Sequence, residues 1–334
     1  IRLSDIKSPA AQPFFQNSIK ISTEDRAFDS FLTNFLPWQA LGGRVMARCG
    51  FYQCGGAWGY RDQLQDVMNL IDVSPALAKR HILRAAASQF EEGDVLHWWH
   101  HLPRAGGGKR GVRTRYSDDF LWLPFVVSVY CEETGDRSIL DVPVPYLTGE
   151  PLQQGEQERY FAPERSSNRG TLYEHCLRAI EYGNRTGPHQ LSLIGGGDWS
   201  DGLNRVGLDG KGESVWLSMF YRMVLERFLP ICRMRGDDER AEVYACRADR
   251  LREAIDAHAW DGDRYLRAFY DDGESMGGAD SNGCTIDLLP QSFAVLSKMP
   301  DVERVERALA TAGEHLIDRE NRLVQLFEDA FDDH

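Results

Sequence analysis

Long hydrophobic runs are missing from this 334-residue sequence. The longest apolar stretch, Phe120 to Cys131, is about half of the roughly 20 residues that a helix needs to cross a bilayer, and Pro124 interrupts it. The first residues, Ile-Arg-Leu-Ser-Asp, have no initiator Met and none of the basic and apolar regions of a signal peptide. We therefore expect no direct membrane insertion, and we expect the chain to be a fragment of a longer one.

Paired cysteines are also absent. The seven cysteines form an odd set without Cys-x-x-Cys spacing, which argues against a disulfide framework and against a thiolate metal site. The histidines of His97-Trp98-Trp99-His100-His101 have no acidic ligand at a metalloprotease spacing, so they are weak support for a metal. The prediction is a cytoplasmic protein without a metal site.

Basic residues are too few to balance the acidic ones. The chain has 38 Lys and Arg against 51 Asp and Glu, a formal net charge of -13, and an acidic surface repels nucleic acid and anionic membranes. No Gly-Lys-Ser/Thr follows Gly195–Gly197, and no Gly-x-Ser-x-Gly elbow occurs, so a nucleotide site and a serine hydrolase have no support. A neutral substrate fits this composition, whereas an anionic substrate requires a local basic pocket.

Helical periodicity, by contrast, is abundant. Apolar residues recur at helical spacing in Leu77–Ala85, Leu172–Ala179, Arg240–Ala259 and Val302–Ala312, and Glu213–Arg235 is apolar on more than one face. Strand-like alternation is best in two short stretches, Leu191–Ile194 and Tyr265–Phe269. Long Gly-rich and aromatic loops separate the helices, and no linker composition appears. We predict a mainly α fold, with one helical toroid over residues 23–334 and residues 1–22 as a linker or the remnant of a preceding domain.

The most distinctive loop is Gly195–Gly202, Gly-Gly-Gly-Asp-Trp-Ser-Asp-Gly. Its glycines permit close approach of the backbone to a ligand. An indole such as Trp199 can stack on the apolar face of a pyranose, and a carboxylic acid beside it can protonate a glycosidic oxygen. The charge of Asp198 and partial burial would both favour the protonated form of Asp201, which a general acid requires. The structural alternative is an Asx-turn with a packed Trp.

A second candidate segment contains Arg61 and Asp62, which could grip sugar hydroxyls. Asp66 lies four residues after Asp62 and would share a helix face with it. At an N-terminal helical turn, Asp62 could instead be a cap and Asp66 a structural ion-pair partner. The sequence leaves both interpretations open.

Two further residues are weaker candidates for substrate contact. Trp99 could belong to a substrate-facing aromatic patch, although plain packing is the favoured interpretation of His97–His101. Asp118 follows Ser117 in a loop that leads into a predicted helix, so simple helix capping is the favoured interpretation there.

Six segments of the chain form an ordered set, namely Phe51-Tyr52-Gln53, Tyr60–Asp66, Glu92–His100, Ser117–Pro124, Thr171–Cys176 and Gly197–Gly202. Together this set resembles the inverting glycoside phosphorylases of glycoside hydrolase family 94. That family includes cellobiose-, chitobiose- and β-1,2-oligoglucan-acting enzymes and the C-terminal region of cyclic β-1,2-glucan synthases. The Arg-Asp-Gln-Leu-Gln-Asp and Trp-Trp-His sequences resemble the β-1,2-glucan branch of the family more closely than they resemble cellobiose phosphorylases.

The resemblance implies an (α/α)6 barrel, with Asp201 as the general acid and with Trp199, Arg61 and Asp62 shaping the donor-sugar subsite. It also places two residues near the same pocket, Arg267 and Gln291. Three residues from the patterns above complete the candidate substrate-binding set, Asp198, Trp99 and Asp118. Of these, Asp198 is expected to tune or brace Asp201.

The implied reaction uses inorganic phosphate as the nucleophile and co-substrate. An inverting hydrolase needs a second carboxylate about 6.5–9.5 Å from the first to activate water, whereas phosphate arrives already anionic and needs a cationic seat. The implied partners are an oligosaccharide with phosphate or, in the synthetic direction, a sugar 1-phosphate. No metal or organic cofactor is required, and a homodimer is a further hypothesis.

The chain departs from the family at both ends. It lacks the N-terminal β-sandwich, and it stops at His334, before the Gly-rich, His-containing stretches that seat phosphate. We therefore expect a barrel that is incomplete at its C-terminus and an isolated chain that is inactive. Two alternatives stay open. One is a noncatalytic or processing sugar-binding domain of a cyclic β-1,2-glucan synthase, associated with the inner membrane, and the other is an inverting glycoside hydrolase.

Overall fold

The computed structural model describes residues 21–48, 55–102 and 108–328, which fall into two compact units. Unit 1 contains the described residues up to Arg113, with Trp122–Pro151 and Arg159–Ala179. Unit 2 contains Thr114–Leu121, Leu152–Glu158 and the described residues from Ile180 onward. Residues 1–20 of the predicted linker and the Phe51-Tyr52-Gln53 motif lie outside the described residues. The single domain over residues 23–334 stays a prediction.

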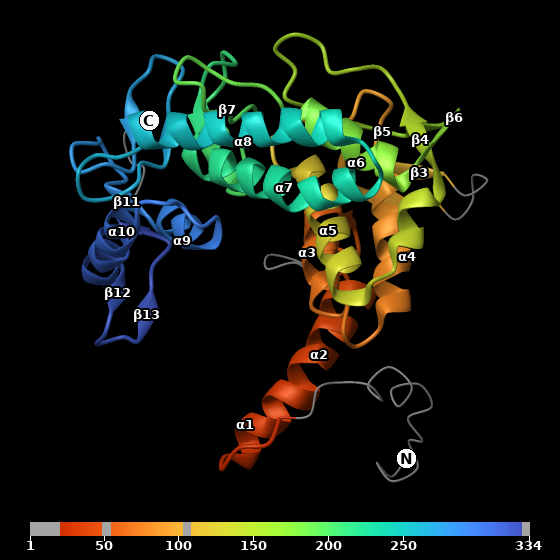
Figure 1. The fold of residues 1–334 in the computed structure, drawn as a ribbon, viewed down its shortest axis with the longest axis horizontal. Helices are drawn as coiled ribbons and strands as arrows, with labels where there is room; N and C mark the ends of the chain where they lie inside the picture. The colour runs from red at the N-terminus through yellow and green to blue at the C-terminus, as the bar shows by residue number, and fades with distance from the viewer. Residues whose placement is uncertain (1–20, 49–54, 103–107, 329–334) are drawn as a thin grey trace. The chain divides into compact units, whose positions relative to one another are not determined.

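Unit 1 has three central helices that pack against one another, α3 (Tyr60–Met68), α4 (Pro75–Ala86) and α5 (Trp122–Thr134) (Figure 1). Pro75 begins α4, where its missing N–H costs nothing, and the apolar spacing of the helix buries Ala78, Ile82 and Ala85. The remaining helical pieces of the unit are α1 (Arg26–Ser30), η2 (Phe31–Phe35), α2 (Leu36–Gln39), η3 (Ala40–Met46) and η5 (Arg137–Asp141), where η marks 3₁₀ or π turns. The helix predicted over Leu77–Ala85 is confirmed as α4.

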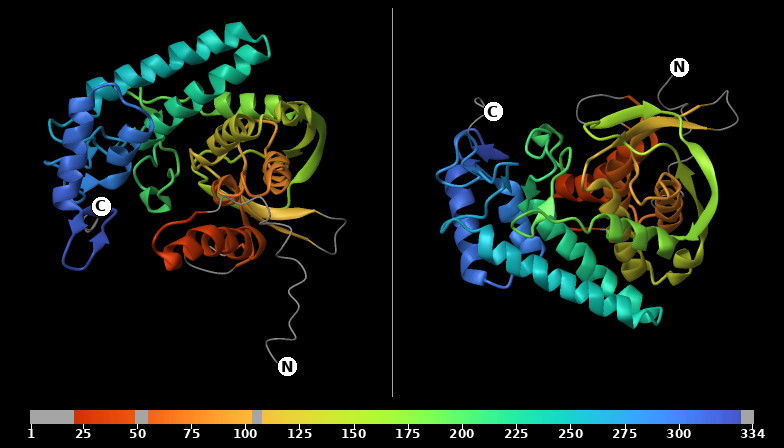
Figure 2. Two further views of the ribbon diagram at one scale, coloured as in Figure 1. Left: turned by 60° about the horizontal axis from the view of Figure 1, so that its bottom comes forward. Right: turned by 90° about the horizontal axis from the view of Figure 1, so that it is seen from above.

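Unit 1 contains strands that the sequence did not predict. One sheet has the order β1 (Trp58–Gly59), β2 (Leu96–His101), β3 (Lys109–Thr114) and β5 (Glu158–Phe161). A longer antiparallel ribbon pairs β4 (Pro143–Thr148) with β6 (Glu164–Thr171) and lies against α4 (Figure 2). The sequence of β6, Glu-Arg-Ser-Ser-Asn-Arg-Gly-Thr, is mostly exposed. Because it carries no apolar alternation, no period-2 signal could reveal it.

Unit 2 is dominated by α7 (Val215–Met234) and α8 (Asp238–His258), which run side by side (Figure 1). Every residue from Val215 to Leu225 is buried, which confirms the prediction for Glu213–Arg235. In α8 the buried residues follow helical spacing on one face, as predicted for Arg240–Ala259. The other helical elements are η4 (Asp119–Leu121), η6 (Asp201–Leu203), α9 (Leu288–Leu296) and α10 (Val302–His315).

A small antiparallel sheet of unit 2 positions the candidate site. Its order is β10 (Ser275–Met276), β9 (Ala268–Phe269), β8 (Glu213–Ser214) and β7 (Ser192–Leu193). The two predicted strands are confirmed here, as β7 and β9. Two short pairs complete the strands, β11 (Ile286–Asp287) with β14 (Phe327–Glu328) and β12 (Ile317–Asp318) with β13 (Leu323–Val324).

The helical predictions hold for the two remaining segments. Leu172–Ala179 lies in α6 (Leu172–Tyr182), and Val302–Ala312 lies in α10. The fold is therefore mainly α, as predicted. Over the described ranges, none of the helices combines the length and the apolar character that crossing a membrane requires.

An aromatic and cationic cluster in unit 1 surrounds Trp58. The ring of His81, on the buried face of α4, lies 5.6 Å from the Trp58 ring, and the guanidinium of Arg84 lies 4.1 Å from it. Burial, with the charges of Arg84 and Arg80, lowers the pKa of His81 from 6.5 to about 4. The imidazole is therefore neutral in the folded protein at neutral pH.

The depressed pKa of His81 predicts acid-dependent stability. Below pH 6.5 the unfolded chain binds a proton at His81, whereas the folded chain binds it only below about pH 4. Proton binding at His81 therefore does not lower the free energy of unfolding above pH 6.5, and it lowers this free energy progressively as the pH falls from 6.5 to about 4. The loss in the free energy of unfolding over this window is on the order of 3 kcal/mol. Urea unfolding between pH 7.5 and 4 should show a shallower pH dependence for His81→Gln than for the wild type. His258→Gln, at an exposed position, is the control; equal slopes in all three proteins would refute the assignment.

Candidate functional site

The loop Gly195–Gly202 connects β7 to η6 in unit 2 and depends on two glycines. Gly195 and Gly197 have φ angles of 61° and 139°, which L-residues rarely adopt. A Cβ atom on Gly197 would lie 2.5 Å from Cε1 of Tyr116, and one on Gly195 would lie 2.4 Å from the carbonyl oxygen of Arg115. The backbone therefore approaches its neighbours as closely as only glycine allows.

The segment before η4 holds this loop in place. Tyr116 forms a backbone bridge with Gly195, and the amide of Gly196 donates to the carbonyl of Arg115 at 3.0 Å. Both the amide and the hydroxyl of Ser117 donate to the carbonyl of Gly197, each at 3.0 Å. Ser117 was expected to cap a helix, but its hydroxyl instead tethers the loop. Asp118, the next residue, is fully buried beside this tether.

A buried ion cluster fixes the first carboxylate of the loop. The guanidinium of Arg267 donates to both carboxylate oxygens of Asp198, at 2.7 Å each, and its Nε donates to Asp287 at 3.0 Å. The hydroxyl of Ser214 donates to Asp198 at 2.6 Å and lies 3.2 Å from Nη1 of Arg267. Asp198, Ser214 and Arg267 are 0% exposed, and Asp287 is 2% exposed. A bidentate pair in the interior is both strong and orienting.

The cluster also sets the charge states of its members. Burial disfavours the Asp198 carboxylate, but the charge and hydrogen bonds of Arg267 outweigh burial and hold the pKa of Asp198 below its usual value. For Asp287 burial prevails over the attraction of Arg267, and its pKa is raised. Burial opposes the charged form of Arg267 too, yet the two carboxylates raise its pKa. Asp198 and Arg267 therefore form a charged pair.

The second carboxylate of the loop has the opposite setting. Asp201 opens η6 and is exposed, so the expected partial burial of Asp201 is wrong, and Trp199 is 37% exposed. The amide of Ser200 donates to Asp198 at 3.0 Å, so the buried carboxylate also orients the turn that leads to Asp201. The loop therefore presents the carboxyl group of Asp201 and the indole of Trp199 at the surface, while the buried pair of Asp198 with Arg267 anchors it.

Two more candidates of unit 2 are buried and engaged with backbone groups or charges. The side-chain oxygen of Gln291 accepts from the amide of Tyr265 at 2.9 Å, and its nitrogen donates to the carbonyls of Tyr265 and Asp287 at 2.7 and 3.0 Å. Gln291 and Arg267 are both 0% exposed. Direct substrate contact by Gln291, Arg267, Asp198 and Asp118 stays a prediction, and the burial of these residues favours bracing roles.

The candidates of unit 1 lie on α3 and β2. Arg61 is buried, whereas the Asp62 side chain in the first turn of α3 is 57% exposed and lies 3.8 Å from Arg44. Asp66 pairs with Arg44 at 2.9 Å, so the ion-pair alternative holds for Asp66. Trp99 is 1% exposed in β2, under the ammonium of Lys109 at 5.0 Å. Packing, the favoured interpretation of Trp99, is what the structure shows, and sugar contact by Arg61, Asp62 and Trp99 stays a prediction.

Three supporting residues were missed by the sequence reasoning. Ser214 accepts a hydrogen bond from the amide of Leu217 and caps α7, and Asp287 accepts from the amide of Leu289 and caps α9. Both precede an apolar run, which is the signal of a helix N-cap and could have revealed the caps. Asp271 accepts from the amides of Asp209, Lys211 and Gly212 and anchors the segment after η6. No sequence signal marks that contact.

No three or more His, Cys, Asp or Glu side chains gather in a metal-binding arrangement within the described parts of the chain.

One family model matches most of the chain. The family model described as "Glycosyl hydrolase 94 superfamily, catalytic domain" matches residues 15–334. The cyclic beta-(1,2)-glucan synthase NdvB of Rhizobium meliloti (strain 1021) is 46% identical over 314 residues, 94% of this chain and 11% of the synthase. The solabiose phosphorylase of Paenibacillus borealis is 34% identical over 254 residues, 75% of this chain and 29% of that protein. The chain thus spans a minor part of the length of both relatives.

A solved structure shares the fold. The rhamnosidase from Klebsiella oxytoca with rhamnose bound superposes with a TM-score of 0.57 at 15% sequence identity, over 89% of this chain and 49% of that chain. This likeness supports the mainly α fold. The chain belongs to the glycosyl hydrolase 94 superfamily and matches its catalytic domain.

Removing the central cation of the cluster should destabilise unit 2. Arg267→Met leaves Asp198 and Asp287 buried without a counter-charge, so we expect the free energy of unfolding to fall by about 3–5 kcal/mol. Urea denaturation measures the loss, and adding Asp198→Asn should recover part of it. The matched control, Arg240→Met, removes a part-exposed pair with Asp237 and should cost less than about 1 kcal/mol. A cost for Arg267→Met no larger than this control would count against the cluster.

Proposed function

We propose that this domain catalyses the inverting phosphorolysis of β-linked gluco-oligosaccharides, or the reverse synthesis, with Asp201 as the general acid. The observation that carries the proposal is that the two aspartates of one loop lie in different surroundings. Asp198 is held in the interior by Arg267, while Asp201 and Trp199 are exposed on the same loop. A loop braced from beneath can present an acid in a fixed position to a glycosidic oxygen.

The chemistry follows from one protein carboxyl group and one external nucleophile. Asp201 donates its proton to the glycosidic oxygen as the bond to the anomeric carbon breaks, and phosphate attacks that carbon from the opposite face. The products are a shortened oligosaccharide and a sugar 1-phosphate of inverted configuration. In the synthetic direction, the Asp201 carboxylate accepts the proton of the acceptor hydroxyl. Trp199 offers an apolar face on which the sugar ring can stack.

The names of the relatives support this reaction class. One is a solabiose phosphorylase, and the other is a cyclic beta-(1,2)-glucan synthase. The proposal includes an (α/α)6 barrel, with Arg61 and Asp62 at the donor-sugar subsite. It needs no metal or organic cofactor, since phosphate or a sugar 1-phosphate is the co-substrate. Two further parts of the proposal are a homodimer and a cytoplasmic location. If the domain is part of a larger glucan synthase, we propose that it lies at the inner membrane.

A second candidate function is a noncatalytic or processing sugar-binding domain within a larger glucan synthase. The observation that favours it is the 46% identity to a synthase of which the matched residues form only 11%. Such a domain would bind β-glucan segments through the same exposed Trp199 without turning them over. The two functions differ in their need for phosphate and for Asp201.

Replacing the proposed acid should abolish turnover. Asp201→Asn keeps the shape of the side chain but cannot donate a carboxylic proton, so we expect phosphorolysis by the full-length natural protein to fall on the order of 10²-fold or more. Release of sugar 1-phosphate from β-1,2-gluco-oligosaccharides measures the rate. Asp209→Asn changes another exposed aspartate of the same segment and should leave the rate within about twofold of wild type. An Asp201→Asn enzyme with normal activity would refute the assignment.

Phosphate dependence separates the candidate functions. With phosphate and β-1,2-gluco-oligosaccharides, the full-length protein should release glucose 1-phosphate as the α anomer, because displacement inverts the β linkage. Nuclear magnetic resonance of the fresh product reads the anomer directly. Free glucose formed equally well without phosphate would identify an inverting hydrolase. Oligosaccharide binding by calorimetry, without turnover or phosphate dependence, would favour the noncatalytic domain.

A further inference from the structure

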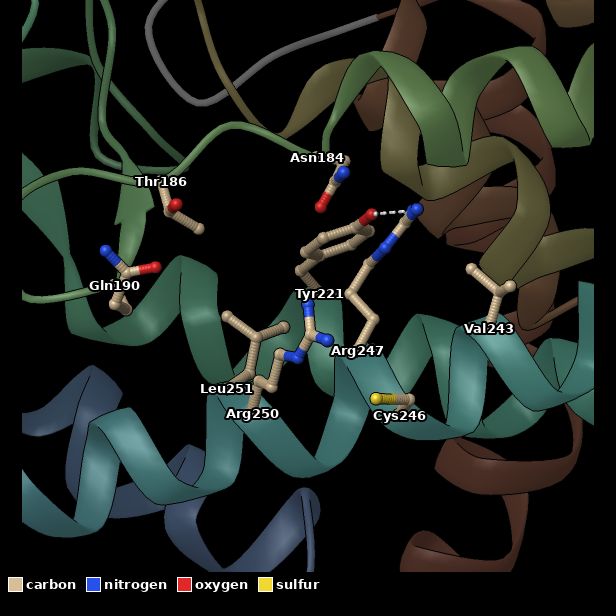
Figure 3. Close-up of a pocket in the computed structure, with 9 residues that line it drawn as sticks. All are labelled: Asn184, Thr186, Gln190, Tyr221, Val243, Cys246, Arg247, Arg250 and Leu251. Atoms are coloured by element: carbon tan, nitrogen blue, oxygen red, sulfur yellow. Dashed lines mark hydrogen bonds between the residues drawn. The ribbon is translucent and has the colours of Figure 1, made fainter.

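A pocket in unit 2 lies away from the residues assigned to catalysis. It has a volume of about 370 Å³, and it is formed by the loop that follows α6 and by one face each of α7 and α8 (Figure 3). That volume is within the range of roughly 300–1,000 Å³ typical of small-molecule sites. None of the residues that line it belongs to the Gly195–Gly202 loop or to the Arg267 cluster.

One wall of the pocket is preorganised around Tyr221. Tyr221 is 1% exposed, and its hydroxyl donates to the carbonyl of Ile180 at 2.8 Å. Nη1 of Arg247 donates to the same hydroxyl at 3.0 Å, and Nη2 of Arg247 lies 3.2 Å from a carboxylate oxygen of Glu181. Arg247 is thus fixed, and Glu181 balances its charge.

A second guanidinium has no such balance. Arg250 lies three residues after Arg247, on the same face of α8, and it also lines the pocket (Figure 3). Within the described ranges Arg250 forms no ion pair, whereas the nearby Arg247 and Arg252 both do. Arg250 is exposed to solvent, and in a chain with a net charge of -13 its guanidinium gives this pocket a cation with which an anionic group can pair.

The opposite wall offers uncharged hydrogen-bonding groups. Asn184, Thr186 and Gln190 line it from the loop after α6. Gln190 has a φ of 61°, and its turn is held by Glu213, whose carboxylate accepts from the amides of His189 and Leu191 at 3.0 and 3.1 Å. Glu213 is itself 1% exposed. Two amides and a hydroxyl on an anchored loop suit the hydroxyl groups of a polyol.

We propose that this pocket binds a small polyhydroxylated ligand that carries one oxyanion, a sugar phosphate or a sugar acid. Arg250 pairs with the oxyanion, and the Asn184 and Gln190 side chains bond the hydroxyls. Phosphate and carboxylate share the geometry that a guanidinium fork recognises, so the shared chemistry defines the site. The site is separate from the catalytic loop, and the proposal stands whether or not Asp201 is the general acid.

Cys246 supplies a local reporter. It is exposed and lines the pocket, so a bound ligand should shield its thiol from iodoacetamide. Mass spectrometry of the peptide that contains Cys246 measures the alkylation rate at this position alone. The probes are glucose 6-phosphate, glucuronate, neutral glucose and inorganic phosphate. We expect glucose 6-phosphate or glucuronate to protect Cys246, and whichever protects identifies the oxyanion. Glucose and inorganic phosphate should each need at least about tenfold higher concentration.

Variants test the assigned contact. Arg250→Gln should weaken protection about tenfold, and Arg250→Lys should weaken it less, because Lys keeps the charge but not the fork. Arg252→Gln, on the same helix but outside the pocket, is the matched control and should protect like wild type. Asp201→Asn should also leave protection unchanged. No protection by either sugar oxyanion, equal protection by glucose or by inorganic phosphate, or full protection in Arg250→Gln would each overturn the proposal.

Discussion

The guanidinium of Arg267 is the contact on which the rest of unit 2 depends. It bonds Asp198 of the glycine-rich loop, Ser214 at the start of α7 and Asp287 at the start of α9. Two carboxylates share one cation in the interior, and desolvation of three charges is costly. The cluster is tolerable because the pair with Asp198 is bidentate and the remaining oxygens meet a hydroxyl or a backbone amide. The loop therefore cannot shift independently of the two helix starts.

This constraint explains how two aspartates three residues apart acquire different settings. Gly197 turns the chain so that Asp198 points inward, and the turn at Ser200 then carries Asp201 to the surface. A charged, paired Asp198 is suited to support, because a group locked to Arg267 has little freedom to exchange protons near neutral pH. An exposed Asp201 is suited to meet a substrate. Position relative to the interior, more than residue type, separates the settings of the two aspartates.

The same logic shows what the sequence could reveal. The helices α7 and α8 follow from apolar spacing, and the loop at Gly195–Gly202 follows from residue types that suit a sugar. The strand β6 could not be predicted, because its residues are polar and mostly exposed. Nor could the cluster, since Arg267 meets Asp198 across 69 residues and Ser214 across 53, and local patterns hold no such information. Sequence reasoning reached Asp198 and Arg267 but neither Ser214 and Asp287 nor the contacts that join the four residues.

The short strand β8 extends this partnership to the pocket. Its two residues are adjacent, so their side chains point to opposite faces of the sheet. Ser214 bonds Asp198 on one side, and Glu213 holds the turn at His189 and Leu191 on the other. Glu213 is buried, and it is accommodated because its carboxylate accepts from the amides of His189 and Leu191 and lies 2.6 Å from Nδ1 of the His189 ring. A Cβ atom on Gly187 would lie 2.5 Å from Cγ of Glu213, so this glycine, like Gly197, makes room for a neighbour. Two residues of backbone thus fix both the candidate catalytic loop and the polar wall of the pocket, and a displacement of β8 would move both together.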